Sequence, residues 1–216
     1  MRLSNGNRLI LIGDSITDEG RNRNHMDPFR EDGLGEGYVK LLAGWLRASW
    51  PDAGLQILNK GISGNTVRDL QNRWQCDVLD LKPDWLSVMI GINDVWRQYD
   101  RLVPESEFVS ADLYRELYGE ILTSVRSHLS GLIVAAPYYL QNDLTDPMRQ
   151  QMDEYRGISR EIAKAFDAHF IDTQSVFDAY MEKADASTLA DDRIHPNIIG
   201  HTLIAREYLR VFDVKL

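Results

Sequence analysis

Cysteine is almost absent from this chain, because Cys76 is the only one among 216 residues. No disulfide can form within one chain, so the fold does not depend on an oxidising compartment. Cys76 falls within an apolar-periodic stretch, and we expect it to be a small buried side chain.

Long hydrophobic runs are also missing. The apolar run Leu9–Ile12 is too short for the core of a signal peptide, and no run approaches the length of a membrane span. The sequence therefore predicts a cytoplasmic protein with no membrane partner.

Basic clusters are the third absence. No run of four Lys or Arg residues occurs, and 24 basic against 33 acidic residues give a net charge of −9. Nucleic-acid binding proteins present a basic face to the phosphates. We therefore expect no nucleic-acid partner.

What remains is an ordinary globular composition, with 44% hydrophobic and 26% charged residues. No linker or internal repeat divides the chain, so its length predicts a single domain over residues 1–216. Short apolar runs alternate with amphipathic helical segments, the last helix covering about Ile199–Phe212. The five predicted strands are Arg8–Gly13, Leu55–Asn59, Trp85–Gly91, Leu132–Pro137 and His169–Thr173.

Alternating strands and helices predict a doubly wound α/β sandwich with a parallel sheet. Ligands bind beyond the carboxyl ends of the strands in such sheets, and candidate residues follow three of them. Ser15 ends the first, in Gly13-Asp14-Ser15. Gly64 follows the second, just before Thr66-Val67-Arg68-Asp69, whose spacing predicts a capping box and a helix start. Asn93 follows the third, and its side-chain amide can donate to an oxyanion as the Gly64 N–H can.

A late loop supplies an acid and an imidazole, Asp192 and His195, before Pro196. A histidine whose tautomer is fixed by a carboxylate can act as general base. Each feature alone is more typical of a turn, a cap or a surface loop. Their joint occurrence predicts a nucleophile, two oxyanion donors and an Asp–His pair.

Other chemistries are less consistent with the chain. The α/β-hydrolase motif G-x-S-x-G fails after Gly61-Ile62-Ser63 because residue 65 is Asn, so we interpret Ser63 as a turn residue. The sequence has no phosphate-binding P-loop and no His/Cys cluster of the kind that holds a metal. We expect no cofactor and no metal.

The four motifs together resemble the GDSL/SGNH hydrolase family, named for its Ser, Gly, Asn and His. Within it, Gly-Asp-Ser-Ile-Thr-Asp, Asn-Lys-Gly-Ile-Ser-Gly-Asn-Thr and Met-Ile-Gly-Ile-Asn-Asp-Val-Trp are most similar to intracellular acetylxylan (acetyl-xylooligosaccharide) esterases. The resemblance implies a flavodoxin-like, three-layer α/β/α sandwich with a five-stranded parallel sheet. It also implies that Ser15, His195 and Asp192 form a catalytic triad. The implied oxyanion hole consists of the Ser15 and Gly64 N–H groups and the Asn93 side chain.

The substrate is less directly encoded. We expect contacts from Asp14 and from aromatic residues that follow strand ends, Trp96, Tyr99 and Tyr138. Residues 18–37 are too many for a tight βα loop and form either a lid or a surface excursion. With the resemblance, these features favour an acetylated xylo-oligosaccharide. The alternatives are an esterase or thioesterase for another acyl group and a non-catalytic carbohydrate-binding protein.

The resemblance further suggests a homo-oligomer, for which Trp45 and Trp50 are either interface or core residues.

Overall fold

The computed structural model describes residues 3–24 and 27–215. Within them, five parallel strands form one sheet in the order β2-β1-β3-β4-β5. The strands are β1 (Arg8–Gly13), β2 (Gln56–Gly61), β3 (Trp85–Met89), β4 (Gly131–Ala135) and β5 (His169–Ile171). The predicted third, fourth and fifth strands run two residues too far, and the predicted second strand ends two residues too early. Gly91 turns the chain with a φ of 128°, and Pro137 has no N–H for a strand ladder.

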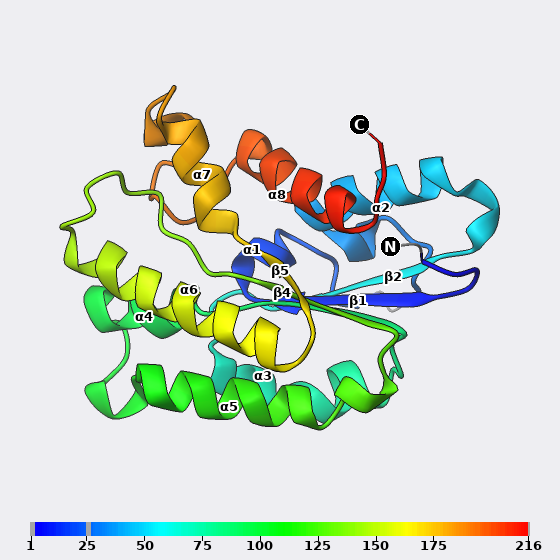
Figure 1. Ribbon diagram of the computed structural model, residues 1–216, viewed down its shortest axis with the longest axis horizontal. Helices are drawn as coiled ribbons and strands as arrows, with labels where there is room; N and C mark the ends of the chain where they lie inside the picture. The colour runs from blue at the N-terminus through cyan, green and yellow to red at the C-terminus, as the bar shows by residue number, and fades with distance from the viewer. Residues whose placement is uncertain (1–2, 25–26, 216) are drawn as a thin grey trace.

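Helices cover both faces of the sheet, which confirms the three-layer sandwich. Figure 1 shows one layer along one face and a second layer along the other. The first layer contains α2 (Tyr38–Ser49), α7 (Thr173–Met181) and α8 (Ile198–Val211), and the second contains α3 (Val67–Trp74), α5 (Ala111–Thr123) and α6 (Pro147–Ala165).

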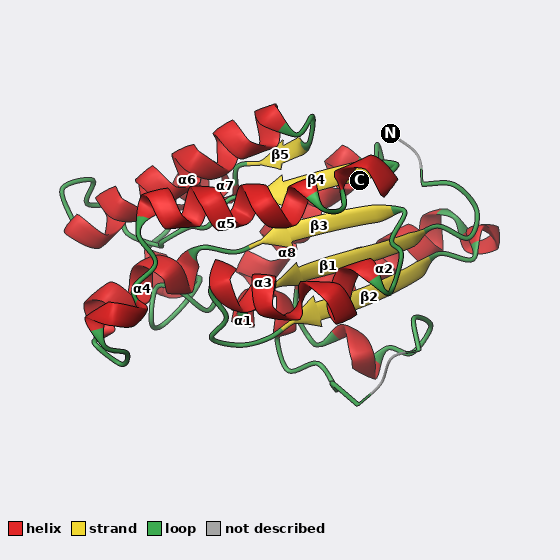
Figure 2. Cartoon of the chain, turned by 90° about the horizontal axis from the view of Figure 1, so that it is seen from below, coloured by secondary structure: helices red, strands yellow, loops and turns green. Residues whose placement is uncertain are grey.

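Two further helices lie at one end of the sheet. They are α1 (Ser15–Asp18) and α4 (Ile92–Asp100), and Figure 2 shows every strand arrow pointing toward the end where they lie. Single 3₁₀ turns connect other elements, at Asp32–Leu34, Pro51–Ala53, Glu105–Glu107, Arg126–His128 and Ala186–Thr188. The end of the sheet that carries α1 and α4 is the one where the sequence places the candidate site.

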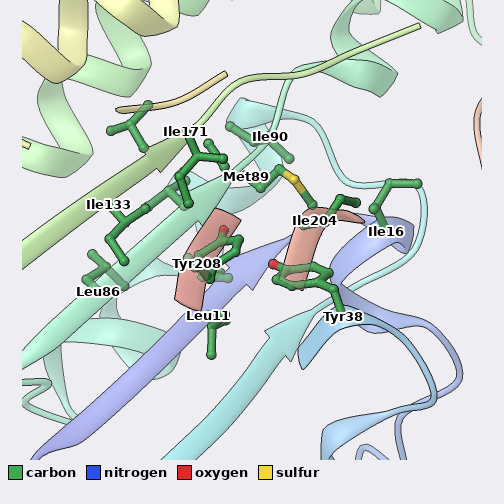
Figure 3. Packing of buried hydrophobic residues seen from close by; sticks show 14 of the residues in the cluster. Leu11, Ile16, Tyr38, Leu86, Met89, Ile90, Ile133, Ile171, Ile204 and Tyr208 are labelled. Carbon is green, nitrogen blue, oxygen red and sulfur yellow. The ribbon is translucent and has the colours of Figure 1, made fainter. Parts of the chain in front are cut away.

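The core fixes the first helical layer against the sheet. Tyr38 of α2 and Tyr208 of α8 stack at 5.3 Å between ring centroids, among the aliphatic side chains shown in Figure 3. Both phenols are buried, and each reaches a polar partner: Tyr208 bonds the Ser87 hydroxyl at 2.8 Å and Tyr38 bonds that of Thr17 at 3.0 Å. Buried hydroxyl groups with partners avoid a desolvation penalty, so this layer is held by packing and by satisfied polar groups.

The prediction for Cys76 is wrong, because its side chain is exposed. After α3 the chain continues into a π-helical turn, Gln75–Leu79. Trp74 and Val78 are buried there, and Cys76 lies two residues from each. Two residues correspond to about half a helical turn, so the cysteine points to the opposite side. In the part of the chain that the structure describes, no helix has the length and apolar character needed to cross a membrane.

Candidate active site

The predicted nucleophile and base lie together at the carboxyl end of the sheet. Ser15 is the first residue of α1, directly after β1, and its Oγ lies 2.8 Å from Nε2 of His195. His195 belongs to the loop between α7 and α8, 180 residues further along the chain. One open cleft of about 590 Å³ is lined by both side chains together with Gly64 and Asn93.

Asp192 completes the arrangement on the far side of the imidazole. Its Oδ2 lies 2.6 Å from Nδ1 of His195. Its Oδ1 accepts the backbone N–H groups of Ile194 at 2.9 Å and of His195 at 2.8 Å. Partial burial opposes ionisation of Asp192, but the hydrogen bonds from His195 and Ile194 outweigh it and hold the pKa of this carboxyl below its usual value. An ionised Asp192 accepts the Nδ1 proton, which leaves Nε2 free to accept the Ser15 proton.

The loop that carries Asp192 and His195 is held by two hydrogen bonds from the segment that follows β4. The phenol of Tyr138 donates to the carbonyl of Ile194 at 2.9 Å, and Leu140 N–H donates to that of Arg193 at 3.0 Å. Tyr138 is only 1% exposed. The expected substrate contact of Tyr138 is therefore wrong: this side chain is part of the core and supports the backbone beside His195.

Asp14 is also unavailable to a ligand, which corrects the second expected contact. It is 2% exposed and caps α1, where its Oδ1 accepts the N–H of Ile16 at 3.0 Å. Burial raises the pKa of Asp14 to about 7, against the opposing effects of the Ile16 hydrogen bond and of nearby His195. Asp14 thus fixes the start of the helix that presents Ser15.

The turn before α3 exposes the backbone of Gly64. The capping box forms as predicted, with Thr66 and Asp69 each bonding the other's backbone. Gly64 has a φ of 85°, which favours glycine, and a Cβ built there meets no atom within 4 Å. Gly64 is therefore exposed in this turn, with open space where a side chain would stand. Ser63 lies in this turn, as expected.

A buried acid that sequence reasoning missed holds this turn in place. Asp18 Oδ2 accepts the N–H of Ser63 at 3.0 Å and its hydroxyl at 3.1 Å, and it also pairs with Arg23. Asp18 is 3% exposed. The signal available in the sequence was a second acid three residues after Ser15, at a strand end where a buried carboxylate needs donors.

The Asn93 amide is oriented by two neighbours. Its Nδ2 donates to the carbonyl of Asn65 at 3.0 Å, and its Oδ1 accepts from the Arg97 guanidinium at 3.2 Å. With the oxygen held by a cation, one proton of the amide nitrogen remains for a ligand in the cleft. Arg97 was also missed, although it follows Asn93 by four residues on the same helix.

Of the other two expected aromatic contacts, one lies in the cleft and one does not. Trp96 lines the cleft, and its ring meets the His195 imidazole edge-on at 5.9 Å between centroids. The Arg97 guanidinium lies 4.6 Å from the centre of the same indole. Tyr99 is 41% exposed and does not line this cleft, so the structure gives it no place beside Ser15.

The long segment after Ser15 forms one rim of the cleft through Glu19 and Gly20. Glu36 N–H donates to the Glu19 carbonyl at 2.8 Å, and Arg21 Nε donates to the Gly61 carbonyl at 2.8 Å. Residues 25–26 of this segment lie outside the described residues. Across residues 3–24 and 27–215, no group of three His, Cys, Asp or Glu side chains is placed to hold a metal ion.

Comparisons with known proteins agree with this geometry. Residues 11–203 match the GDSL-like lipase/acylhydrolase family. An acetylxylan esterase from Geobacillus stearothermophilus is 43% identical over 213 residues, 97% of this chain and 95% of that protein. A crystal structure of Axe2, an acetylxylan esterase from the same organism, is 42% identical with a TM-score of 0.94, covering 100% of this chain and 98% of that one.

Other solved structures are equally similar. Catalytic mutants of Axe2 in which a serine, a histidine or an aspartate is replaced by alanine superimpose with TM-scores of 0.94 to 0.95 at 41% identity, each over 100% of this chain and 98% of that one. The α/β hydrolase LAE5, from the metagenome of Lake Arreo, is 40% identical with a TM-score of 0.94 over 98% of this chain and 97% of that one.

Proposed function

Because this chain belongs to the GDSL-like lipase/acylhydrolase family, we propose that it removes acetyl groups from xylo-oligosaccharides with Ser15 as the nucleophile. It is a carboxylic ester hydrolase. The observation that carries the proposal is the continuous hydrogen-bond chain from Ser15 through His195 to Asp192.

In the first half-reaction, Ser15 Oγ attacks the ester carbonyl while His195 Nε2 takes the hydroxyl proton. The negative charge of Asp192 stabilises the imidazolium that forms. His195 then gives this proton to the sugar oxygen as the C–O bond to the acyl carbon breaks. The products of this step are a free sugar hydroxyl and an acetyl-Ser15 ester.

In the second half-reaction, a water molecule loses a proton to His195 and attacks the acetyl-Ser15 carbonyl. The bond between the acetyl carbon and Ser15 Oγ breaks, His195 gives the proton to Ser15 Oγ, and acetate leaves. In both steps the carbonyl oxygen becomes negative, and the Ser15 N–H, the Gly64 N–H and the Asn93 amide receive it. These donors are fixed before the reaction, the Gly64 N–H by its turn and the Asn93 amide by its neighbours, which lowers the cost of stabilising new charge.

Two observations support the roles and the substrate. In the catalytic mutants of Axe2, the replaced aspartate precedes the replaced histidine by three residues, the separation between Asp192 and His195. The Trp96 indole beside His195 presents an apolar surface of the kind that packs on sugar rings.

The test is acetate release from acetylated xylo-oligosaccharides, measured beside hydrolysis of para-nitrophenyl acetate. We expect both activities in the wild type and their loss in Ser15→Ala. Ser127→Ala is the matched control, since Ser127 is exposed in the turn before β4, at the opposite end of the sheet. Turnover of the aryl ester alone favours an esterase or thioesterase for another acyl group. Saccharide binding without turnover of either substrate favours a carbohydrate-binding protein.

We also propose a cytoplasmic homo-oligomer. Trp45 is 48% exposed on α2, where it can contact a second copy, whereas Trp50 packs against the core. A fold without an intrachain disulfide suits a reducing compartment. Light scattering after gel filtration of the wild type and Trp45→Glu tests the assembly, and a monomeric wild type contradicts it.

A further inference from the structure

A second cavity adjoins the catalytic cleft on the side of the oxyanion donors. Its volume is about 330 Å³, at the lower end of the range of roughly 300–1,000 Å³ typical of ligand sites. It shares Gly64, Asn93 and Arg97 with the cleft but contains neither Ser15 nor His195. We call it the side cavity.

The two spaces meet at Gly64, Asn93 and Arg97, which line both of them. Gly64 has no side chain of its own at this border, and a Cβ built on it meets no atom within 4 Å. The side cavity is therefore the neighbouring space for the part of a ligand that extends beyond the cleft.

The lining of the side cavity carries both signs of charge. Two arginines contribute cations and Phe108 adds an apolar surface. The carboxyl groups are those of Asp69, Asp94 and Glu107, and the cations are Arg68 and Arg97. The carboxylates repel an anionic ligand, and the guanidinium groups repel a cationic ligand. An alkyl chain in this space strips water from charged groups without replacing their hydrogen bonds, which is unfavourable. A neutral polyhydroxyl ligand satisfies both kinds of group, because each hydroxyl donates and accepts.

The reaction geometry assigns the order of the sugar units. His195 must protonate the leaving oxygen, so the acetylated sugar itself lies in the cleft beside His195 and Trp96. The next unit of the same oligosaccharide can then extend toward the side cavity, which shares Arg97 with the cleft. We propose that the side cavity binds this neighbouring, unreacting sugar unit, an inference that rests on the proposed function and adds a second saccharide subsite to it.

The experiment compares the kcat/KM for acetylated xylotriose with that for para-nitrophenyl acetate, and the readout is the ratio of the two. We expect Arg68→Ala to lower this ratio about tenfold, equal to about 1.4 kcal/mol. Arg68 also donates to the backbone carbonyl of Glu107 at 3.3 Å, so its removal can shift that loop. Glu107→Ala is the second variant, because it removes an exposed carboxylate and leaves that carbonyl in place.

Arg115→Ala is the matched control. Arg115 is half-exposed on α5 and pairs with Glu161, so its replacement should leave the ratio unchanged. A lowered ratio in both cavity variants, larger for xylotriose than for xylobiose, supports the subsite. An unchanged ratio in both overturns the subsite and leaves the proposed function standing.

Two other outcomes also overturn the inference. If the variants change the preference between para-nitrophenyl acetate and butyrate but not the ratio, the side cavity holds the acyl group. If the wild type cleaves aryl esters and releases no acetate from oligosaccharides, the proposed function itself fails.

Discussion

Replacing Asp192 by Asn tests the catalytic assignment most directly, because Asp191 beside it provides an internal control. In Asp192→Asn the side-chain oxygen can still accept the backbone N–H groups of Ile194 and His195, so the loop keeps its shape. The group facing Nδ1 becomes an amide NH₂, which is a donor. His195 must then carry its proton on Nε2, where it faces Ser15 and cannot accept the hydroxyl proton.

The exposure of the pair sets the size of the effect. In a buried serine triad the equivalent change lowers kcat by roughly 10⁴-fold. Here the side chains of His195 and Asp192 are 38% and 45% exposed, so water can help the imidazole return to the productive tautomer. We therefore expect a loss in kcat of about 10³-fold, or about 4 kcal/mol of transition-state stabilisation.

The assay is steady-state hydrolysis of para-nitrophenyl acetate and of acetylated xylo-oligosaccharides, with circular dichroism to verify folding. Asp191→Asn should stay within about twofold of wild type, since Asp191 is exposed and adjoins the pair at the wrong spacing. Equal losses in the two variants would refute the argument, as would a folded Asp192→Asn enzyme that retains a third of the wild-type kcat.

Three further predictions concern the proposed oxyanion donor Asn93, its neighbour Arg97 and the buried carboxyl of Asp14. Asn93→Ala should lower kcat by about 10²–10³-fold with little change in KM, and a change confined to KM would assign Asn93 to substrate binding instead. Arg97→Met should lower kcat about tenfold, less than loss of the donor itself, because the Asn93 amide loses the cation that fixes its oxygen; Arg97→Lys should recover part of that loss in the same kinetic assay. Asp14→Asn should raise Tm at about pH 8 by at least about 2 °C and leave Tm near pH 4 close to wild type, as followed by thermal melts at both pH values. The sign follows from the raised pKa: the stabilising contribution of Asp14 is fully present below its unfolded pKa of about 3.9 and is lost as pH rises through about 7, whereas Asn stays neutral throughout.

The proposed catalytic residues could be found in the sequence because each occupies a position whose backbone geometry is set by the fold. Ser15, Gly64 and Asn93 all follow strands of one parallel sheet, and the carboxyl ends of such strands meet at one edge. His195 joins them from a loop that Pro196 keeps out of the following helix. The sequence did not reveal the buried side chains that support the turns carrying these residues. Asp18 and Tyr138 act through backbone groups of distant turns, and no local pattern encodes such partners.

The substrate contacts show where helical phase would have improved the prediction. Trp96, Arg97 and Tyr99 all follow Asn93 on α4, and successive residues of a helix are rotated by ~100°. Trp96 and Arg97, three and four residues on, fall within ~60° of Asn93 and line the cleft with it. Tyr99, six residues on, is turned by ~120° and is exposed elsewhere. Proximity to a strand end is therefore a weak criterion for an aromatic contact, whereas a separation of three or four residues from a donor on the same helix identifies the side chains that share its cleft.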